Sequence, residues 1–134
     1  MRNETWNFLG KQIEAGQKLQ VMICPYGEDY EIPTTIINGE NTGKTIVING
    51  GLHSCEFPGV VACMTTAAEI DPKKVNGRIV IIHCLNSSGF TERTDSIVPE
   101  DGMNLNRDFY GDKNGTISRK IMAFLADKIM PIAD

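Results

Sequence analysis

The chain has 134 residues, of which 41% are hydrophobic and 22% charged, a composition typical of one globular domain. Seventeen acidic residues outnumber thirteen basic ones, the formal net charge is −4, and no basic cluster occurs. Nucleic-acid binding is therefore excluded, because it needs grouped Lys and Arg. A membrane span is excluded as well, since no apolar run approaches about 18 residues.

The first part of the chain carries three strand patterns. Residues 18–24 alternate apolar and polar side chains, which predicts a strand. Residues 30–38 predict a second strand, in which Pro33 indicates an edge position or a bulge. We expect a turn at residues 41–43, followed by a short buried strand over residues 45–49.

The next part alternates helix and strand. A helix is expected from Pro58 to the Asp71-Pro72 pair, with Pro58 in its first turn. Its predicted apolar face consists of Val60, Met64, Ala67 and Ala68. Residues 78–85 form the most apolar run and predict a central strand. Strand, helix and strand in this order predict a βαβ unit with parallel strands.

The last part is a long polar stretch, residues 86–115, followed by a helix. A polar segment of this length inside a domain is usually functional. The final helix is capped by Thr116 or Ser118 and ends at Pro131. Its predicted buried side chains are Ile121, Phe124, Leu125 and Ile129.

These patterns predict an α/β fold with a mixed, partly parallel sheet and flanking helices. The two earlier strands form an antiparallel ribbon added to that sheet. Residues 1–134 make one domain, within which residues 1–29 form an N-terminal strand or extension. The sequence does not indicate an oligomeric state.

The four cysteines, at positions 24, 55, 63 and 84, include no C-x-x-C pair. The polar N-terminus lacks the apolar core of a signal peptide, so we expect a cytoplasmic protein with free thiols. Cys63 and Cys84 lie in apolar segments and are expected in the core.

A candidate metal site follows the strand at residues 45–49. His53 and Glu56 are three residues apart, just after Gly50-Gly51, and both side chains are suitable zinc ligands. Open α/β sheets carry their sites at such strand ends. The alternative is a helix-capping glutamate beside a surface histidine.

A candidate anion site lies in the polar stretch. Asn106 and Arg107 could hold a carboxylate, and Arg93 is a second candidate cation. The alternative is a turn-rich loop in which Arg107 pairs with Asp101 or Asp108.

Other catalytic arrangements find little support in the sequence. His83 lies in an apolar strand and is expected to be a buried neutral imidazole with one hydrogen bond. Cys55 adjoins His53, but sequence neighbours seldom form a catalytic pair. No nucleophile elbow, P-loop or G-x-G-x-x-G motif is present.

Three segments together resemble the succinylglutamate desuccinylase/aspartoacylase family. They are G-G-L-H-S-C-E-F-P-G at residues 50–59, R-I-V-I-I-H-C-L-N at residues 78–86, and D-G-M-N-L-N-R at residues 101–107. The resemblance covers about residues 30 to 134 and implies a carboxypeptidase A-like zinc hydrolase, of which this chain is the N-terminal portion of the catalytic domain.

The resemblance also implies roles for single residues. His53 and Glu56 match the first two zinc ligands, and Asn106 and Arg107 match the pair that grips the substrate's carboxylate. Arg93 lies where the family carries an arginine that polarises the scissile carbonyl, although Asp95 stands where many members have a second arginine. One zinc ion belongs to each complete site.

The family's third ligand, a histidine, and its general-base glutamate come later than residue 134, so we expect this chain alone to be incomplete and inactive. The implied reaction of the whole protein is hydrolysis of the amide bond in a small N-acyl amino acid. One alternative is a non-catalytic or partner-dependent binding module that lacks the third zinc ligand, and another is an α/β domain with accidental motifs.

Overall fold

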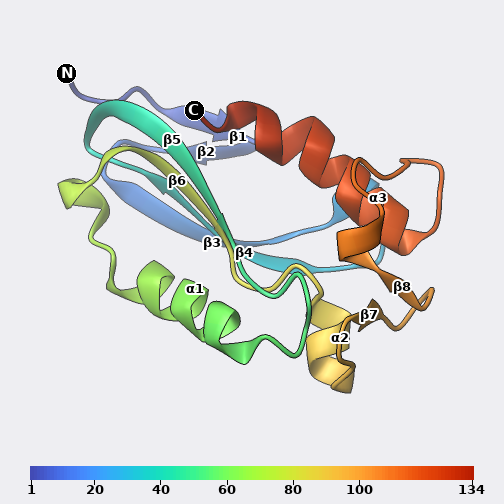
Figure 1. Cartoon of the computed structure of the whole chain (residues 1–134). Helices are drawn as coiled ribbons and strands as arrows, with labels where there is room; N and C mark the ends of the chain where they lie inside the picture. Colours follow the sequence, from blue (N-terminus) through green and yellow to red (C-terminus); the bar gives the residue numbers. More distant parts are fainter.

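The computed structural model describes residues 1–134 and is built on a four-stranded sheet of order β3-β4-β6-β5 (Figure 1). The strands are β3 (Gln17–Ile23), β4 (Ile32–Asn38), β5 (Asn41–Asn49) and β6 (Asn76–Ile82). β5 and β6 are parallel, whereas β4 runs antiparallel to both β3 and β6. The predicted mixed sheet and parallel pair are therefore confirmed.

The position of β4 differs from the prediction. Pro33 indicated an edge or a bulge, but β4 lies inside the sheet between β3 and β6. The Pro33 carbonyl accepts a 2.9 Å hydrogen bond from the His83 N–H, so the proline nitrogen faces the same side. Pro33 lies opposite His83, and β6 ends one residue earlier, at Ile82. The N–H that proline lacks would therefore not have bonded to a residue of β6.

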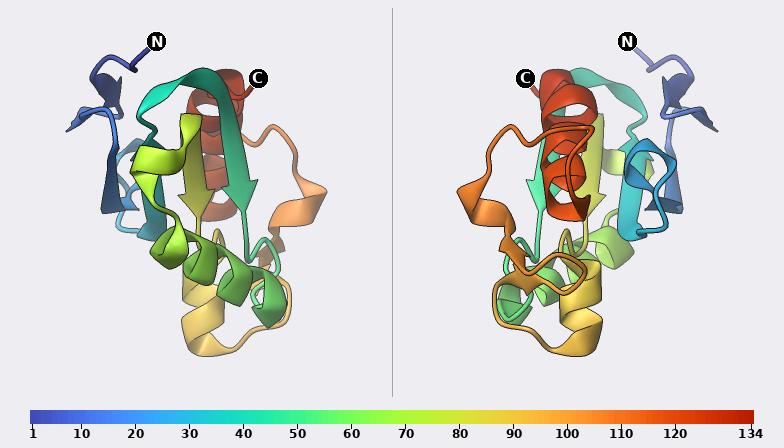
Figure 2. Two further views of the ribbon diagram at one scale, coloured as in Figure 1. Left: turned by 90° about the vertical axis from the view of Figure 1, so that its left-hand side faces the viewer. Right: turned by 90° about the vertical axis from the view of Figure 1, so that its right-hand side faces the viewer.

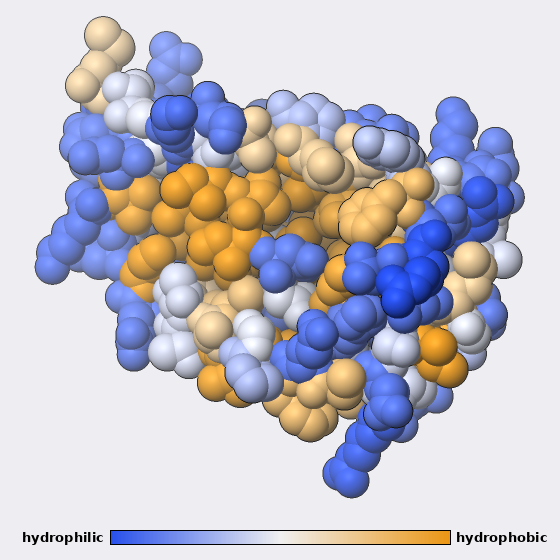
Figure 3. All heavy atoms as spheres, in the orientation of Figure 1, coloured by the Kyte–Doolittle hydropathy of each residue, from blue (hydrophilic) through white to orange (hydrophobic).

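The position of β5 also differs. Residues 41–43 form no turn, because Asn41 already pairs with Asn76 in the sheet. Gly43 is needed for close approach: a Cβ there would lie 2.7 Å from the Asn76 carbonyl oxygen. The strand is not buried either, since it forms the sheet edge, where Ile46 is 53% exposed. Figure 3 shows apolar atoms gathered over this region.

Helices cover both faces of the sheet (Figure 2). α1 (Phe57–Glu69) packs Cys63 and Ala67 against Ile37 and Ile81. The alternate strand residues, including Ile36, Val80 and Ile82, belong to a larger core on the other face with Ile121 and Phe124. Met64 and Ala68, predicted on the buried face of α1, are both exposed, Met64 by 54%, and Cys63 is buried there instead.

The C-terminal helix begins as predicted and ends irregularly. α3 (Ile117–Phe124) continues as a π-helix over Leu125–Ile129 and a 3-10 turn over Met130–Ile132. Ile121, Phe124 and Ile129 are buried as expected, and Leu125 is half-buried. Neither the Thr116 side chain nor any other hydroxyl caps the first turn.

The N-terminal segment adds a hairpin of β1 (Trp6–Phe8) and β2 (Lys11–Ile13), two strands that the sequence patterns did not reveal. Phe8 and Ile13 are buried in the larger core, so the hairpin packs on the same body as the sheet. None of the helices in the structure combines the length and hydrophobicity needed to cross a membrane.

The long polar stretch contains short elements: α2 (Ser87–Glu92), β7 (Ile97–Val98) and β8 (Met103–Asn104). A 3-10 turn at Leu105–Arg107 follows β8. All of them lie beyond the carboxyl ends of β5 and β6 (Figure 1). The four cysteines are free, and Cys63 and Cys84 are buried as predicted.

Candidate active site

The loop that carries the candidate ligands leaves the carboxyl end of β5. Gly50 accepts a backbone hydrogen bond of 2.9 Å from Leu85, which follows β6. A Cβ at Gly50 would lie 2.8 Å from the carbonyl oxygen of His83, so glycine alone lets the two segments come this close. The loop is thus held at the end of the parallel pair, where α/β sheets bind ligands.

His53 and Glu56 contact each other at the start of α1. The His53 Nδ1 atom lies 3.1 Å from Glu56 Oε1, and 20% of the histidine side chain and 61% of the glutamate side chain are exposed. Glu56 occupies the N-cap position, but its side chain makes no capping hydrogen bond. The helix-capping alternative is therefore wrong, and the carboxylate is free to act as a ligand.

Asn104 fixes the other side of the imidazole. Its Oδ1 atom accepts a 2.9 Å hydrogen bond from the Asn106 N–H and lies 3.1 Å from His53 Nε2. Because Oδ1 can only accept, Nε2 carries the hydrogen. In the neutral ring Nδ1 then has a lone pair, which faces the Glu56 carboxylate.

Two acceptors 3.1 Å apart repel each other unless a positive charge joins them. A proton on Nδ1 would do this, and so would a metal ion bound by the nitrogen and the carboxylate oxygen together. The donor set suits zinc, for which imidazole nitrogen and carboxylate oxygen are both regular ligands. His53 and Glu56 therefore fit the implied metal as two of its ligands.

No third ligand joins this pair within the chain, because nowhere do three His, Cys, Asp or Glu side chains gather in a way that could hold a metal ion. The Nε2 atom of His83 instead lies 2.8 Å from Thr35 Oγ1, and burial lowers the pKa of His83. His83 is half-buried rather than fully buried, but it makes the one expected hydrogen bond and its lowered pKa favours the neutral imidazole. The Cys55 thiol is not the partner of His53, whose two ring nitrogens contact Glu56 and Asn104.

Asp101 anchors the loop that carries the candidate anion site. Its carboxylate accepts hydrogen bonds from Ser118 Oγ at 2.6 Å, from the Ser118 N–H at 2.8 Å and from the Met103 N–H at 3.1 Å. Burial alone raises the pKa of Asp101, but the hydrogen bonds from Ser118 and its neighbours outweigh this and lower it. The loop is thereby tied to the first turn of α3.

Arg107 has no carboxylate partner. Asp101 is engaged with Ser118, and Asp108 pairs with Arg119 at 2.7 Å. The guanidinium of Arg107 donates only to the Asn106 carbonyl oxygen, at 2.9 Å. The pairing of Arg107 with Asp101 or Asp108 is thus wrong, and the exposed guanidinium is available to an anion.

Arg93 lies in a third segment at this end of the sheet. It caps α2 with a left-handed backbone, φ 59°. Its side chain lines a cavity of about 550 Å³ together with Cys55, Phe57 and Phe90. Ser54 holds the segment in place, because its hydroxyl donates a 2.6 Å hydrogen bond to the carbonyl oxygen of Thr94, the residue after Arg93.

The structure therefore brings together residues 53–56, 93–95 and 104–107, although it shows no contact between the Arg93 guanidinium and His53 or Glu56. Sequence reasoning missed Ser54, Asp101 and Asn104 as positioning residues. The signal for Asn104 was its spacing of two residues from Asn106 in M-N-L-N-R. No sequence pattern identifies Ser54 or Asp101, because their partners are backbone atoms or lie on α3.

The chain is similar to known proteins over most of its length. Residues 42–134 match the model of the succinylglutamate desuccinylase/aspartoacylase catalytic domain. Over 105 residues the chain is 32% identical to an N-alpha-acetyl-L-2,4-diaminobutyric acid deacetylase of Halomonas elongata. The matched region covers 77% of this chain and 30% of the deacetylase.

Solved structures show the same fold. A succinylglutamate desuccinylase of a Silicibacter species is 31% identical with a TM-score of 0.79, covering 87% of this chain and 37% of that one. A product-bound ectoine utilization protein of Ruegeria pomeroyi gives 30% identity, a TM-score of 0.79 and the same coverage. The expected carboxypeptidase A-like fold is confirmed. The chain spans only about a third of the length of these relatives.

Proposed function

The chain belongs to the succinylglutamate desuccinylase/aspartoacylase family, and from this membership we propose that the whole protein is a zinc-dependent deacylase. Family relatives are described as a deacetylase and a desuccinylase, enzymes that remove acyl groups. We propose as substrate a small N-acyl amino acid with a free carboxylate. The observation that carries the proposal is the imidazole of His53, held at Nε2 by Asn104 with its Nδ1 atom 3.1 Å from Glu56 Oε1.

His53 and Glu56 would hold the zinc ion, which supplies a Lewis acid and activates water for attack on an amide carbonyl. A catalytic zinc takes three protein ligands, of which these residues provide two. We propose that the remaining histidine and the general-base glutamate belong to a part of the whole protein outside these 134 residues. Asn104 keeps the hydrogen of His53 on Nε2, so that Nδ1 stays a ligand.

The substrate's carboxylate would be bound by Arg107 and Asn106. The Asn106 side chain makes no hydrogen bond within the chain, and the Arg107 guanidinium donates only to the Asn106 carbonyl oxygen, which leaves donors for a carboxylate. Binding there fixes one end of the substrate and so orients its amide bond. Arg93 is proposed to stabilise the oxygen of the carbonyl as negative charge develops, in the manner of an oxyanion hole.

A non-catalytic binding module is the second candidate function, because only two metal donors meet in this chain. Such a module would keep the Asn106–Arg107 anion site without hydrolysis. The two candidates differ in turnover and agree in carboxylate binding.

The test is hydrolysis of N-acetyl and N-succinyl amino acids by the whole protein, beside the same compounds with the carboxylate amidated. We expect turnover of at least one free acid, none for His53→Ala, and a KM raised about tenfold or more by Arg107→Ala. Lys113→Ala, an exposed cation without an ion pair, is the control. An unchanged KM in Arg107→Ala would exclude the carboxylate role. Binding of the free acids without turnover would establish the module.

A further inference from the structure

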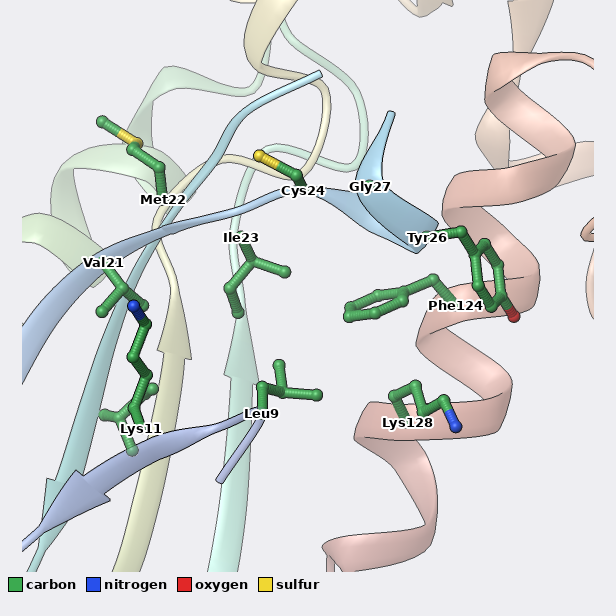
Figure 4. Close-up of a pocket in the computed structure, with 11 residues that line it drawn as sticks. Leu9, Lys11, Val21, Met22, Ile23, Cys24, Tyr26, Gly27, Phe124 and Lys128 are labelled. Carbon is green, nitrogen blue, oxygen red and sulfur yellow. The ribbon is translucent and has the colours of Figure 1, made fainter. Parts of the chain in front are cut away.

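A cavity of about 320 Å³ lies away from the candidate active site, between the N-terminal hairpin, the end of β3 and the C-terminal helix (Figure 4). It shares no residue with the segments that carry His53, Arg93 and Arg107. Its wall is mostly apolar, formed among others by Leu9, Val21, Ile23, Ile36 and Phe124. The cavity is large enough to take a small organic molecule.

Leu9 stands at this cavity in an unfavourable backbone conformation. Leu9 and Gly10, the central residues of the β1–β2 turn, both have positive φ, 49° and 76°. Such turns favour Asn-Gly, because a leucine is strained at positive φ. Burial does not offset the strain, since Leu9 is 39% exposed. Its side chain instead points toward Phe124 across the cavity (Figure 4).

Strain also marks the opposite wall. Tyr26 has φ 51°, and its ring meets the ring of Phe124 edge-on with centroids 5.6 Å apart. The helix that carries Phe124 changes to a π-helix over Leu125–Ile129, which includes Lys128. Two of the four non-glycine residues with positive φ, Leu9 and Tyr26, thus line this one cavity. Strained backbone and π-helical segments concentrate at functional sites.

The charges at the cavity are all positive. Lys11 and Lys128 are its only charged lining residues, and neither forms an ion pair or a side-chain hydrogen bond. The nearby carboxylate of Asp127 is engaged, because it accepts a 2.7 Å hydrogen bond from the Tyr26 hydroxyl. Two free ammonium groups beside an apolar wall, in a chain of net charge −4, complement an anion with an apolar tail.

We propose that this cavity binds a small amphiphilic monocarboxylate, with its alkyl or aryl tail against Leu9, Ile23 and Phe124 and its carboxylate paired with Lys11 or Lys128. The apolar wall supplies the binding free energy and the lysines select the charge. The site is separate from the proposed active site, and its test needs no catalytic activity.

Titration of the whole protein with octanoate, followed by methyl NMR, tests the proposal. We expect saturable shifts of the Leu9, Val21, Ile23 and Ile36 methyl groups. Octylamine, which has the same tail and the opposite charge, should bind about tenfold more weakly or worse. Lys11→Gln and Lys128→Gln should each weaken the binding of octanoate. For the lysine that contacts the carboxylate, the loss of affinity should be about threefold or more.

Leu9→Asn is the decisive variant, because asparagine suits the turn and keeps the fold. It should raise the melting temperature, and it should lower the affinity for octanoate about fivefold or more because the apolar contact is lost. Equal binding of octanoate and octylamine would overturn the proposal. So would unchanged affinity in Leu9→Asn, unchanged affinity in both lysine variants, or shifts confined to methyl groups elsewhere.

Discussion

The imidazole of His53 lies between two oxygen acceptors, and this decides which of its nitrogens can bind a metal. Asn104 Oδ1 accepts a hydrogen bond from Nε2, which leaves Nδ1, 3.1 Å from Glu56 Oε1, as the nitrogen that can bind a metal. The hydrogen bond orients the ring as well as fixing its tautomer. Asn104 is thus a positioning residue for the metal ligand.

Replacing Asn104 by alanine should therefore weaken zinc binding by the whole protein about 10-fold to 100-fold. Asn104→Asp should retain most of the affinity, since a carboxylate oxygen accepts the same hydrogen bond. Competition with a chromophoric chelator measures both variants. Equal zinc affinity of wild type and Asn104→Ala would show that the amide has no part in ligand orientation.

Asp101 provides a pH-dependent anchor for the site loop. Hydrogen bonds from Ser118 and the loop backbone, acting against burial, hold the pKa of Asp101 below its ordinary value of 3.8. The carboxylate's contribution to stability is fully present above that ordinary value and is lost as the pH falls through the lowered pKa. Asp101→Asn should destabilise the chain at pH 7 by about 1 kcal/mol.

The same variant should lose part of the acid sensitivity, because no proton binds to the amide. Urea unfolding at several pH values below 5 measures the effect, with Asp29→Asn as the control for an exposed acid. Parallel curves for Asp101→Asn and wild type between pH 5 and about 2 would rule out the linkage.

At the scale of single residues, sequence reasoning identified the chemistry-bearing side chains and missed those that hold them. His53, Glu56, Asn106 and Arg107 stand out by type and spacing at strand ends. The structure brings them to one end of the sheet, while their catalytic roles stay predictions. The contact of Ser54 with the carbonyl of Thr94 depends on tertiary placement, which no local pattern encodes.

Helix α1 lacks a basic residue in its last turn and receives a cation from the sheet instead. The Lys18 ammonium on β3 donates to the carbonyl oxygens of Ala67, Ala68 and Ile70 at 2.8 to 3.0 Å. A cation at this end stabilises both the unpaired carbonyls and the helix dipole. The contact also joins α1 to the far strand of the sheet.

Lys18→Met should lower the free energy of unfolding by about 1–2 kcal/mol, as the apolar stem remains and the ammonium is lost. Chemical denaturation measures the change. Lys44→Met is the matched control, because the exposed Lys44 side chain has no hydrogen bond or ion pair. If the free energy of unfolding falls no more than in the control, water hydrogen-bonds to these carbonyl oxygens as well as the ammonium does.

At the scale of elements, hydrophobic periodicity predicted the βαβ unit and the C-terminal helix, and failed where tertiary context decides. Residues 45–49 are apolar enough for a buried strand, yet β5 is an edge strand. Pro33 is tolerated inside the sheet only because β6 ends beside it. The π-helix over Leu125–Ile129 has no sequence signature that we recognise.

For the whole molecule, one end of the sheet gathers the candidate ligands, the anion-binding pair and Arg93 from three segments. The backbone of Asp134 donates to the Thr45 carbonyl oxygen, so the last residue lies on the β5 edge. Residues 42–134 match the family's catalytic domain, and the hairpin and β3 before them pack into the same core. The account depends on His53 and Glu56 being metal ligands in the whole protein.

The zinc content of the protein purified from its own cells tests this claim most directly. Elemental analysis should find about one zinc ion per chain in the wild type. His53→Ala should retain almost none, and the Lys113→Ala control should match the wild type. A wild-type protein without zinc, or a His53→Ala variant with as much zinc as the wild type, would contradict the account.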